Sequence, residues 1–165
     1  MRWPKDALKK SIKGIFLATL LLAAQENGKP LNEAAWILLG AILVTVVDAY
    51  AFHISNRHDD GALAYVRNLI GGVMQDLPRV LGTLPTLLFL LLAAMFHWRP
   101  ERRNPDGSLS VGYDTVALYI NVVLLLIVGT LAAYRSGSSV RGMILIGLLN
   151  AALGLLIVAL EVELQ

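Results

Sequence analysis

The residue with the clearest chemical potential is Asp48, an acid inside the apolar run from Trp36 to Ser55. A helix of about 20 residues, rising about 1.5 Å per residue, crosses a hydrocarbon core about 30 Å thick. An ionisable side chain on such a helix costs free energy unless it meets a partner or water, so it marks a candidate functional site. The chemistry open to this carboxylate is the binding of a proton or a cation.

Polar side chains that can hydrogen-bond a buried carboxylate occur on three of the apolar stretches. Thr45 precedes Asp48 by three residues and shares its helical stripe, whereas Asn121 and Asn150 belong to two later stretches. Together these four residues form the expected ion or proton pathway. In the alternative interpretation, the same hydrogen bonds only hold Asp48 in place as a packing contact.

His53 follows Asp48 by five residues, which places it about 140° away around a helix. It is therefore expected near the cytoplasmic interface, off the stripe that carries Asp48. Because the unperturbed pKa of imidazole is about 6.5, His53 is a candidate pH sensor. The alternative is an interfacial, partly hydrated histidine with no sensing role.

The composition indicates a membrane protein. The chain is 56% hydrophobic and 16% charged, with a mean hydropathy of +0.64, whereas soluble domains carry about 25% charged residues. With no cysteines, the chain has neither disulfides nor thiolate metal ligands. No basic stripe interleaved with aromatic residues supports nucleic-acid binding. The lipid bilayer is the expected partner, and no cofactor or metal ion is expected.

Five apolar stretches predict an all-α, polytopic membrane protein in which residues 1–165 form a single transmembrane helical domain. The expected spans are residues 12–24, 35–55, 79–98, 116–134 and 142–160. Residues 62–77 carry apolar side chains at helical spacing with polar ones opposite, which predicts an interfacial amphipathic helix. Pro78 is expected at the start of the third span.

The first apolar stretch has a second interpretation. A basic start, a short apolar core and small residues are also typical of a signal peptide. Whether this segment is cleaved stays open at the level of sequence.

The distribution of Lys and Arg predicts the orientation. With a cytoplasmic N-terminus, only four of the 14 Lys and Arg residues lie outside, namely Lys29, Arg99, Arg102 and Arg103. Cytoplasmic loops are enriched in Lys and Arg. The sequence therefore predicts a multi-pass protein of the cell membrane, such as a bacterial inner membrane, with its C-terminus outside.

Gly147, Ala151 and Gly154 form a stripe of small residues on the last expected span. Small residues let helix backbones approach closely, so the stripe predicts a helix-packing interface, either within one chain or between copies. Because five helices of this length enclose little space alone, a homo-oligomer or a larger membrane complex is expected.

Two resemblances to known proteins add to these predictions. The segment Asp60-Gly61-Ala62-Leu63-Ala64, with the later Gly72 and Asp76, resembles part of the motif of the CDP-alcohol phosphatidyltransferases. In that family an arginine and a further acid complete the motif and the acids hold metal, whereas this chain has Tyr65 and Val80 there. The resemblance implies a membrane phosphatidyltransferase, but the residues themselves predict no catalytic group and no enzyme.

The overall layout is similar to that of small polytopic membrane proteins of bacteria. The similarity covers Asp48-Ala49-Tyr50-Ala51 and Asn150-Ala151-Ala152-Leu153-Gly154-Leu155, and it implies a fold class without an activity. The leading functional hypothesis is a homo-oligomeric channel or an ion- or proton-coupled transporter that uses Asp48. The alternative is a non-catalytic accessory or assembly subunit of a membrane complex, whose polar residues lock helix packing.

Overall fold

The structure is a computed structural model that describes residues 5–25, 28–55, 62–100, 102–103 and 109–164. It confirms the all-α class. The helices are α1 (Lys5–Ala23), α2 (Pro30–Ser55), α3 (Ala62–Met95), α4 (Tyr113–Arg135) and α5 (Val140–Leu164). Between α3 and α4, the two-residue strands β1 (Arg102–Arg103) and β2 (Leu109–Ser110) pair in antiparallel fashion.

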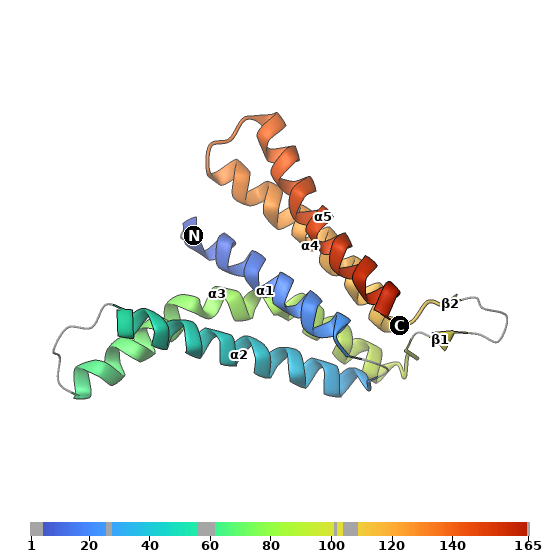
Figure 1. Cartoon of the computed structure of the whole chain (residues 1–165), viewed down its shortest axis with the longest axis horizontal. Helices are drawn as coiled ribbons and strands as arrows, with labels where there is room; N and C mark the ends of the chain where they lie inside the picture. The colour runs from blue at the N-terminus through green and yellow to red at the C-terminus, as the bar shows by residue number, and fades with distance from the viewer. Residues whose placement is uncertain (1–4, 26–27, 56–61, 101, 104–108, 165) are drawn as a thin grey trace.

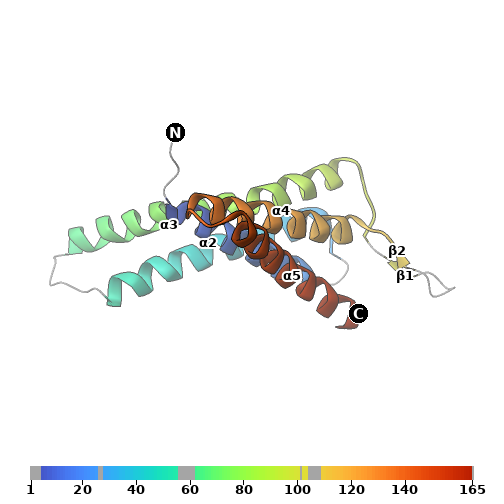
Figure 2. The ribbon, with the colours of Figure 1, turned by 90° about the horizontal axis from the view of Figure 1, so that it is seen from above.

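The helices form two antiparallel pairs, α2 with α3 and α4 with α5, and α1 lies between the pairs (Figure 1). The pairs converge near β1 and β2 and diverge toward the beginning of α1. Figure 2 shows the same arrangement from above, with α5 crossing over the middle of the molecule. Because α1 packs against all four other helices, it is the element that holds the two pairs together.

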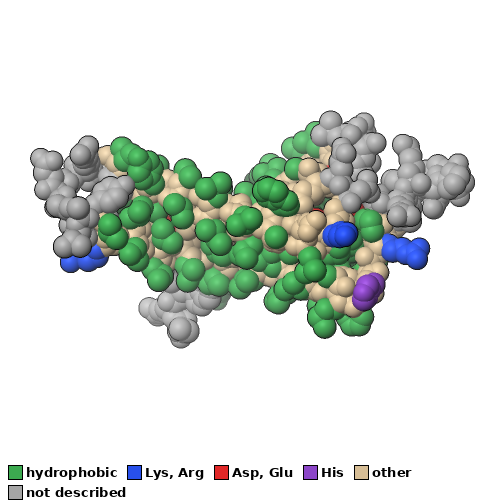
Figure 3. Space-filling model, turned by 90° about the horizontal axis from the view of Figure 1, so that it is seen from below, with side chains coloured by type: hydrophobic (Ala, Val, Ile, Leu, Met, Phe, Trp, Pro, Cys, Tyr) green, Lys and Arg blue, Asp and Glu red, His purple; other side chains and the backbone are tan. Residues whose placement is uncertain are grey.

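Four of the described helices contain segments long and apolar enough to cross a membrane. These segments are Pro30–Phe52, Val66–Met95, Tyr113–Arg135 and Val140–Glu161. Hydrophobic side chains cover most of the face in Figure 3, and residues such as Leu43, Leu88 and Leu149 are exposed. An apolar surface of this extent suits contact with lipid, so the fold is compatible with a multi-pass integral membrane protein.

The predicted count of five spans is not confirmed, because α1 is not among the four candidate segments. The first half of α1 carries five charged residues, namely Lys5, Asp6, Lys9, Lys10 and Lys13. Its apolar part, from Gly14 to Ala23, is about ten residues or about 15 Å long, half the thickness of a hydrocarbon core. The expected span at residues 12–24 is instead the second half of this helix.

The expected separate amphipathic helix at residues 62–77 is not confirmed either. Those residues are the first part of α3, which continues through Pro78 and Pro85 to Met95. Proline removes a backbone donor, and side-chain hydroxyls can bond nearby carbonyls in such helices. Thr83 Oγ1 donates to the Val80 carbonyl at 2.8 Å. The 34-residue helix is about 51 Å long, so it must tilt, bend or extend beyond a hydrocarbon core.

The crossing of α1 over α3 depends on two glycines. A Cβ atom at Gly14 would overlap the carbonyl oxygen of Arg79, and one at Gly82 would overlap the carbonyl oxygen of Ser11. Ser11 Oγ also donates to the Pro78 carbonyl at 3.1 Å. This backbone-to-backbone contact places the lysine-bearing half of α1 directly against the middle of α3.

The small-residue stripe of α5 packs within the chain. A Cβ atom at Gly147 would overlap Thr130 Oγ1, and one at Gly154 would lie 2.9 Å from Leu125 Cδ1, both on α4. Ala151 packs against the hydrophobic core. The stripe therefore makes a helix contact within one chain, and an interface between copies stays a prediction.

Candidate functional site

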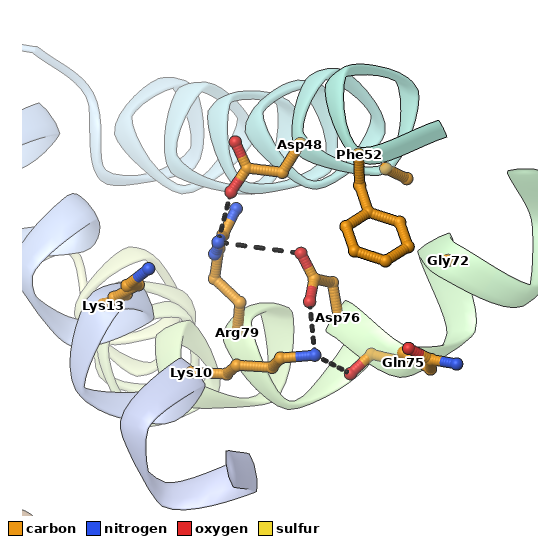
Figure 4. Close-up of a pocket in the computed structure, with 9 residues that line it drawn as sticks. Lys10, Lys13, Asp48, Phe52, Gly72, Gln75, Asp76 and Arg79 are labelled. Atoms are coloured by element: carbon orange, nitrogen blue, oxygen red, sulfur yellow. Dashed lines mark hydrogen bonds and ion pairs between the residues drawn. The ribbon is translucent and has the colours of Figure 1, made fainter. Parts of the chain in front are cut away.

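Five charged side chains from α1, α2 and α3 gather around one cavity (Figure 4). They are Lys10, Lys13, Asp48, Asp76 and Arg79. The cavity has a volume of about 350 Å³, and Phe52, Gly72 and Gln75 also line it. Charged groups at this density are costly near hydrocarbon, so the cluster is the strongest candidate site in the described residues.

Arg79 lies at the centre of the cluster and is 4% exposed. Its Nη2 atom is 2.5 Å from Asp48 Oδ2 and 3.6 Å from Asp76 Oδ2. Asp76 precedes Arg79 by three residues on the same helix, a spacing that brings side chains together. One guanidinium therefore interacts with acids from both α2 and α3.

Lys10 extends the network to α1. Its ammonium nitrogen is 2.6 Å from Asp76 Oδ1 and donates to the Gln75 carbonyl oxygen at 2.8 Å. Asp76 thus lies between Lys10 and Arg79 (Figure 4). The result is a chain of charge contacts that joins three helices.

Lys13 follows Lys10 by three residues and lines the same cavity. It also lines a second cavity of about 310 Å³, together with Asp48 and Arg79. The ion pairs found among the described residues do not include Lys13. Three cations therefore face two carboxylates, which leaves this site with one excess positive charge.

The guanidinium of Arg79 also has unused donors. Its Nε and Nη1 atoms are buried and have no hydrogen-bond partner in the described part of the chain. A buried donor without a partner costs about 1–3 kcal/mol, and more when it belongs to a charged group. At this site, donors of Arg79 therefore lack acceptors, and positive charges outnumber negative ones.

The expected partners of Asp48 are corrected by the structure. Asp48 bonds Arg79 rather than an asparagine. Asn121 Oδ1 accepts a bond from Thr86 Oγ1 at 2.6 Å, and Asn150 Nδ2 donates to the Ile146 carbonyl at 2.9 Å. The physical reason is the packing order. Among the described residues, the backbone of α2 packs against α1 and α3 and does not closely approach α4 or α5.

Thr45 precedes Asp48 by three residues and is buried, but its Oγ1 atom has no hydrogen-bond partner within the described residues. The four residues of the expected pathway are therefore not brought together. The side chain of His53 lies outside the described residues, so its proposed pH-sensing role stays a prediction.

The segment that resembles the phosphatidyltransferase motif is described only in part. Asp60 and Gly61 lie outside the described residues. Gly72 and Asp76 line the charged cavity, where Asp76 forms ion pairs with Lys10 and Arg79.

A second polar contact, which no sequence pattern indicated, joins the beginnings of α2 and α4. The Tyr113 hydroxyl is 2.7 Å from both Glu33 Oε1 and the Gly28 carbonyl oxygen. Both side chains are buried, and Glu33 Oε2 has no partner in the described residues. This contact lies near the converging end of the bundle and ties the α1–α2 connection to α4.

The sequence contained a signal for the charged site. Lys10 and Lys13 are three residues apart, as are Asp76 and Arg79, so each pair shares a helix face. As loop charge, Lys10, Lys13 and Arg79 contribute only to the predicted orientation, and the interfacial helix predicted at residues 62–77 includes Asp76. The sequence signal for the site is therefore the three-residue spacing of these charges next to apolar runs.

Comparison of the chain with known protein families, with curated proteins and with solved structures gave no match. The functional proposal therefore depends on the geometry and charge of the site.

Proposed function

We propose that this chain is an integral membrane protein of the transport class, in which Asp48 takes up the proton or cation that couples or permeates. The observation that carries the proposal is the Asp48–Arg79 ion pair beside an open cavity. Both residues belong to helices that contain candidate spans. An ionisable residue at such a position, together with its partner, is by default a hypothesis of function.

Asp48 is the reachable member of the pair. Its side chain is 47% exposed, compared with 5% for Arg79. Asp48, Lys13 and Arg79 line both cavities. A change in the charge of Asp48 would therefore alter the electrostatic potential in both cavities.

Proton uptake by Asp48 would remove the charge that holds Nη2 of Arg79. Arg79 would then keep Asp76, at 3.6 Å, as its remaining carboxylate. Since Asp48–Arg79 is the ion pair between α2 and α3 in the described residues, its loss weakens the link between these helices. A ligand shifts a conformational equilibrium when it binds one state better, and a proton on Asp48 would favour a state in which α2 and α3 separate.

The test is flux in liposomes that contain the purified chain, a trapped pH dye and a series of ions. Asp48→Asn keeps the shape of the side chain but removes its titration, so pH-dependent flux should disappear while yield is retained. Asp6→Asn is the matched control, because Asp6 is an exposed acid on α1 that contacts Lys9 at 4.0 Å. Wild-type flux that persists in Asp48→Asn would remove this residue from the mechanism. The absence of flux with every ion would overturn the transport proposal.

A second candidate function is an accessory or assembly subunit, in which the charges only organise helix packing. The observation that favours it is that Asp76 and Arg79 are both buried and that the network joins α1, α2 and α3. Buried ionic groups can specify one packing arrangement rather than increase stability. In that case flux is absent, and native mass spectrometry in mild detergent should show an oligomer or a stable complex with another membrane protein.

A further inference from the structure

We infer that the cavity lined by Lys10, Lys13 and Arg79 is a binding site for a phosphate-class anion, supplied either by a lipid headgroup or by free phosphate. The inference does not require transport, because an accessory subunit would need the same charge compensation. It assigns a ligand class to a cavity whose charges are otherwise unbalanced.

The cavity is lined by more positive than negative side chains. Lys13 has no ion pair with an acid among the described residues, although it lies beside two carboxylates that already hold Arg79 and Lys10. Lys13 is itself exposed, whereas Arg79 is buried, and charge near hydrocarbon that lacks a partner is costly. An anion placed between Lys13 and the Arg79–Lys10 side of the cavity would offset the excess positive charge.

The cationic side chains of the cavity supply hydrogen-bond donors for an anion. Two ammonium groups from α1 and one guanidinium from α3 face the cavity (Figure 4). Phosphate oxygens accept several charge-assisted hydrogen bonds from such groups, and guanidinium groups are especially suited to phosphate. The donors on Nε and Nη1 of Arg79 are buried and have no protein acceptor within the described residues, so an added anion would use them only where the guanidinium turns toward the cavity.

The volume of the cavity is sufficient for a phosphate group. One water molecule occupies about 30 Å³ of liquid, and the cavity of about 350 Å³ is many times larger. Gly72 helps to keep α2 and α3 close at its edge, since an added Cβ atom would lie 3.1 Å from Ala49 Cβ. The cavity is therefore large enough for a phosphate group with its own hydration.

Asp48 and Asp76 also line the cavity, and their negative charges would repel an anion bound there. This opposition predicts the sign of one variant, because removing a carboxylate charge should tighten anion binding. Asp48→Asn should therefore strengthen binding, whereas the loss of Lys13 should weaken it. A site defined only by general positive charge at the membrane surface would respond equally to any lysine of α1.

The experiment uses the purified full chain in a non-ionic detergent and follows its unfolding midpoint. Inorganic phosphate is titrated at constant ionic strength against chloride. Mixed detergent micelles that contain phosphatidylglycerol, a net anionic phosphodiester, are compared with mixed micelles that contain phosphatidylcholine, whose phosphodiester charge is neutralised by its own choline group. We expect a saturable upward shift with phosphate, with phosphatidylglycerol or with both, because a ligand that binds the native state stabilises it. Saturation with phosphate identifies a small-anion site, and a response to phosphatidylglycerol alone identifies a lipid headgroup site; either outcome supports the inference.

The variants locate the site. Lys13→Gln should weaken the apparent affinity about tenfold, the effect of losing one charge-assisted hydrogen bond, and Lys13→Arg should retain it. Lys9→Gln is the matched control, since it removes the same charge from the same helix but does not line the cavity. The inference is overturned if no anion shifts the midpoint beyond chloride and phosphatidylcholine, or if Lys9→Gln weakens binding as much as Lys13→Gln. A failure of flux with binding intact would affect only the transport proposal.

Discussion

Arg79 Nη2 on α3 lies 2.5 Å from Asp48 Oδ2 on α2, although the two residues are 31 positions apart in the chain. The contact joins a buried cation to a half-exposed acid. It turns an acid that would be costly alone in a membrane helix into one member of a pair. The other contacts of Asp76 and Lys10 extend this pair into a network across three helices.

A double-mutant cycle should measure this relationship. Asp48→Leu and Arg79→Leu each leave a charge without its main partner, whereas the double variant removes both, and replacing both members by apolar residues can be nearly neutral. We expect a coupling of about 1–3 kcal/mol in the free energy of unfolding. Detergent-solubilised chain, unfolded by heat or denaturant, provides the measurement.

The exposed pair Asp6–Lys9 is the control for that cycle. Its atoms are 4.0 Å apart at the surface of α1, and exposed pairs of this kind contribute about 0–1 kcal/mol. If the coupling between Asp48 and Arg79 is no larger than that of the control pair, the contact does not hold α2 against α3.

The glycine crossing of α1 and α3 predicts a difference between two alanine variants of the same helix. Gly82→Ala would overlap the Ser11 carbonyl oxygen, so the helices must shift apart, at a cost of about 1–3 kcal/mol. At Gly71 an added Cβ would meet no atom within 4 Å among the described residues outside its own helical turn, and alanine favours a helix by about 1 kcal/mol over glycine. Gly71→Ala should therefore be neutral or stabilising in the same unfolding assay. Equal destabilisation by both variants would contradict the close crossing.

The contact between Tyr113 and Glu33 predicts a third stability difference. Tyr113→Phe removes the hydroxyl beside Glu33 Oε1 and the Gly28 carbonyl oxygen, and stranding such buried acceptors costs about 1–3 kcal/mol. Tyr119→Phe is the control on the same helix, because Tyr119 is exposed, and changes at such surface positions are usually within about 0.5 kcal/mol. A Tyr113→Phe variant as stable as the control would show that the bond contributes nothing.

The orientation with a cytoplasmic N-terminus can be tested by cysteine labelling, since the chain has no native cysteine. The beginning of α1 and the connection between α4 and α5 lie at the diverging end of the bundle, and the beginnings of α2 and α4 lie at the converging end (Figure 1). Lys9 and Ser139 belong to the first group and Lys29 and Val111 to the second, and all four are exposed. An impermeant thiol reagent applied to intact cells should label cysteine at positions 29 and 111 but not at 139. Because α1 is not among the four candidate spans, protection of position 9 tests separately whether α1 also crosses the membrane. The opposite pattern would invert the predicted topology.

The sequence by itself determined the helical class and most helix positions. Helical spacing and long apolar runs are local properties, so α2, α4 and α5 cover the expected spans with ends that differ by only a few residues. Asp48 was also recognised from sequence, because an acid within an apolar run is conspicuous whatever surrounds it.

The tertiary structure decided which residues meet. Whether α3 continues through Pro78 depends on its neighbours as well as on its own residues, and the partner of Asp48 depends on α2 packing against α3 rather than α4 or α5. Arg79 follows Pro78 at the start of the third expected span, and only the close crossing of α1 and α3 at Gly14 and Gly82 brings the lysines of α1 to its side. Contacts between residues far apart in the chain arise from the packing of whole helices, and no local pattern of residues encodes them.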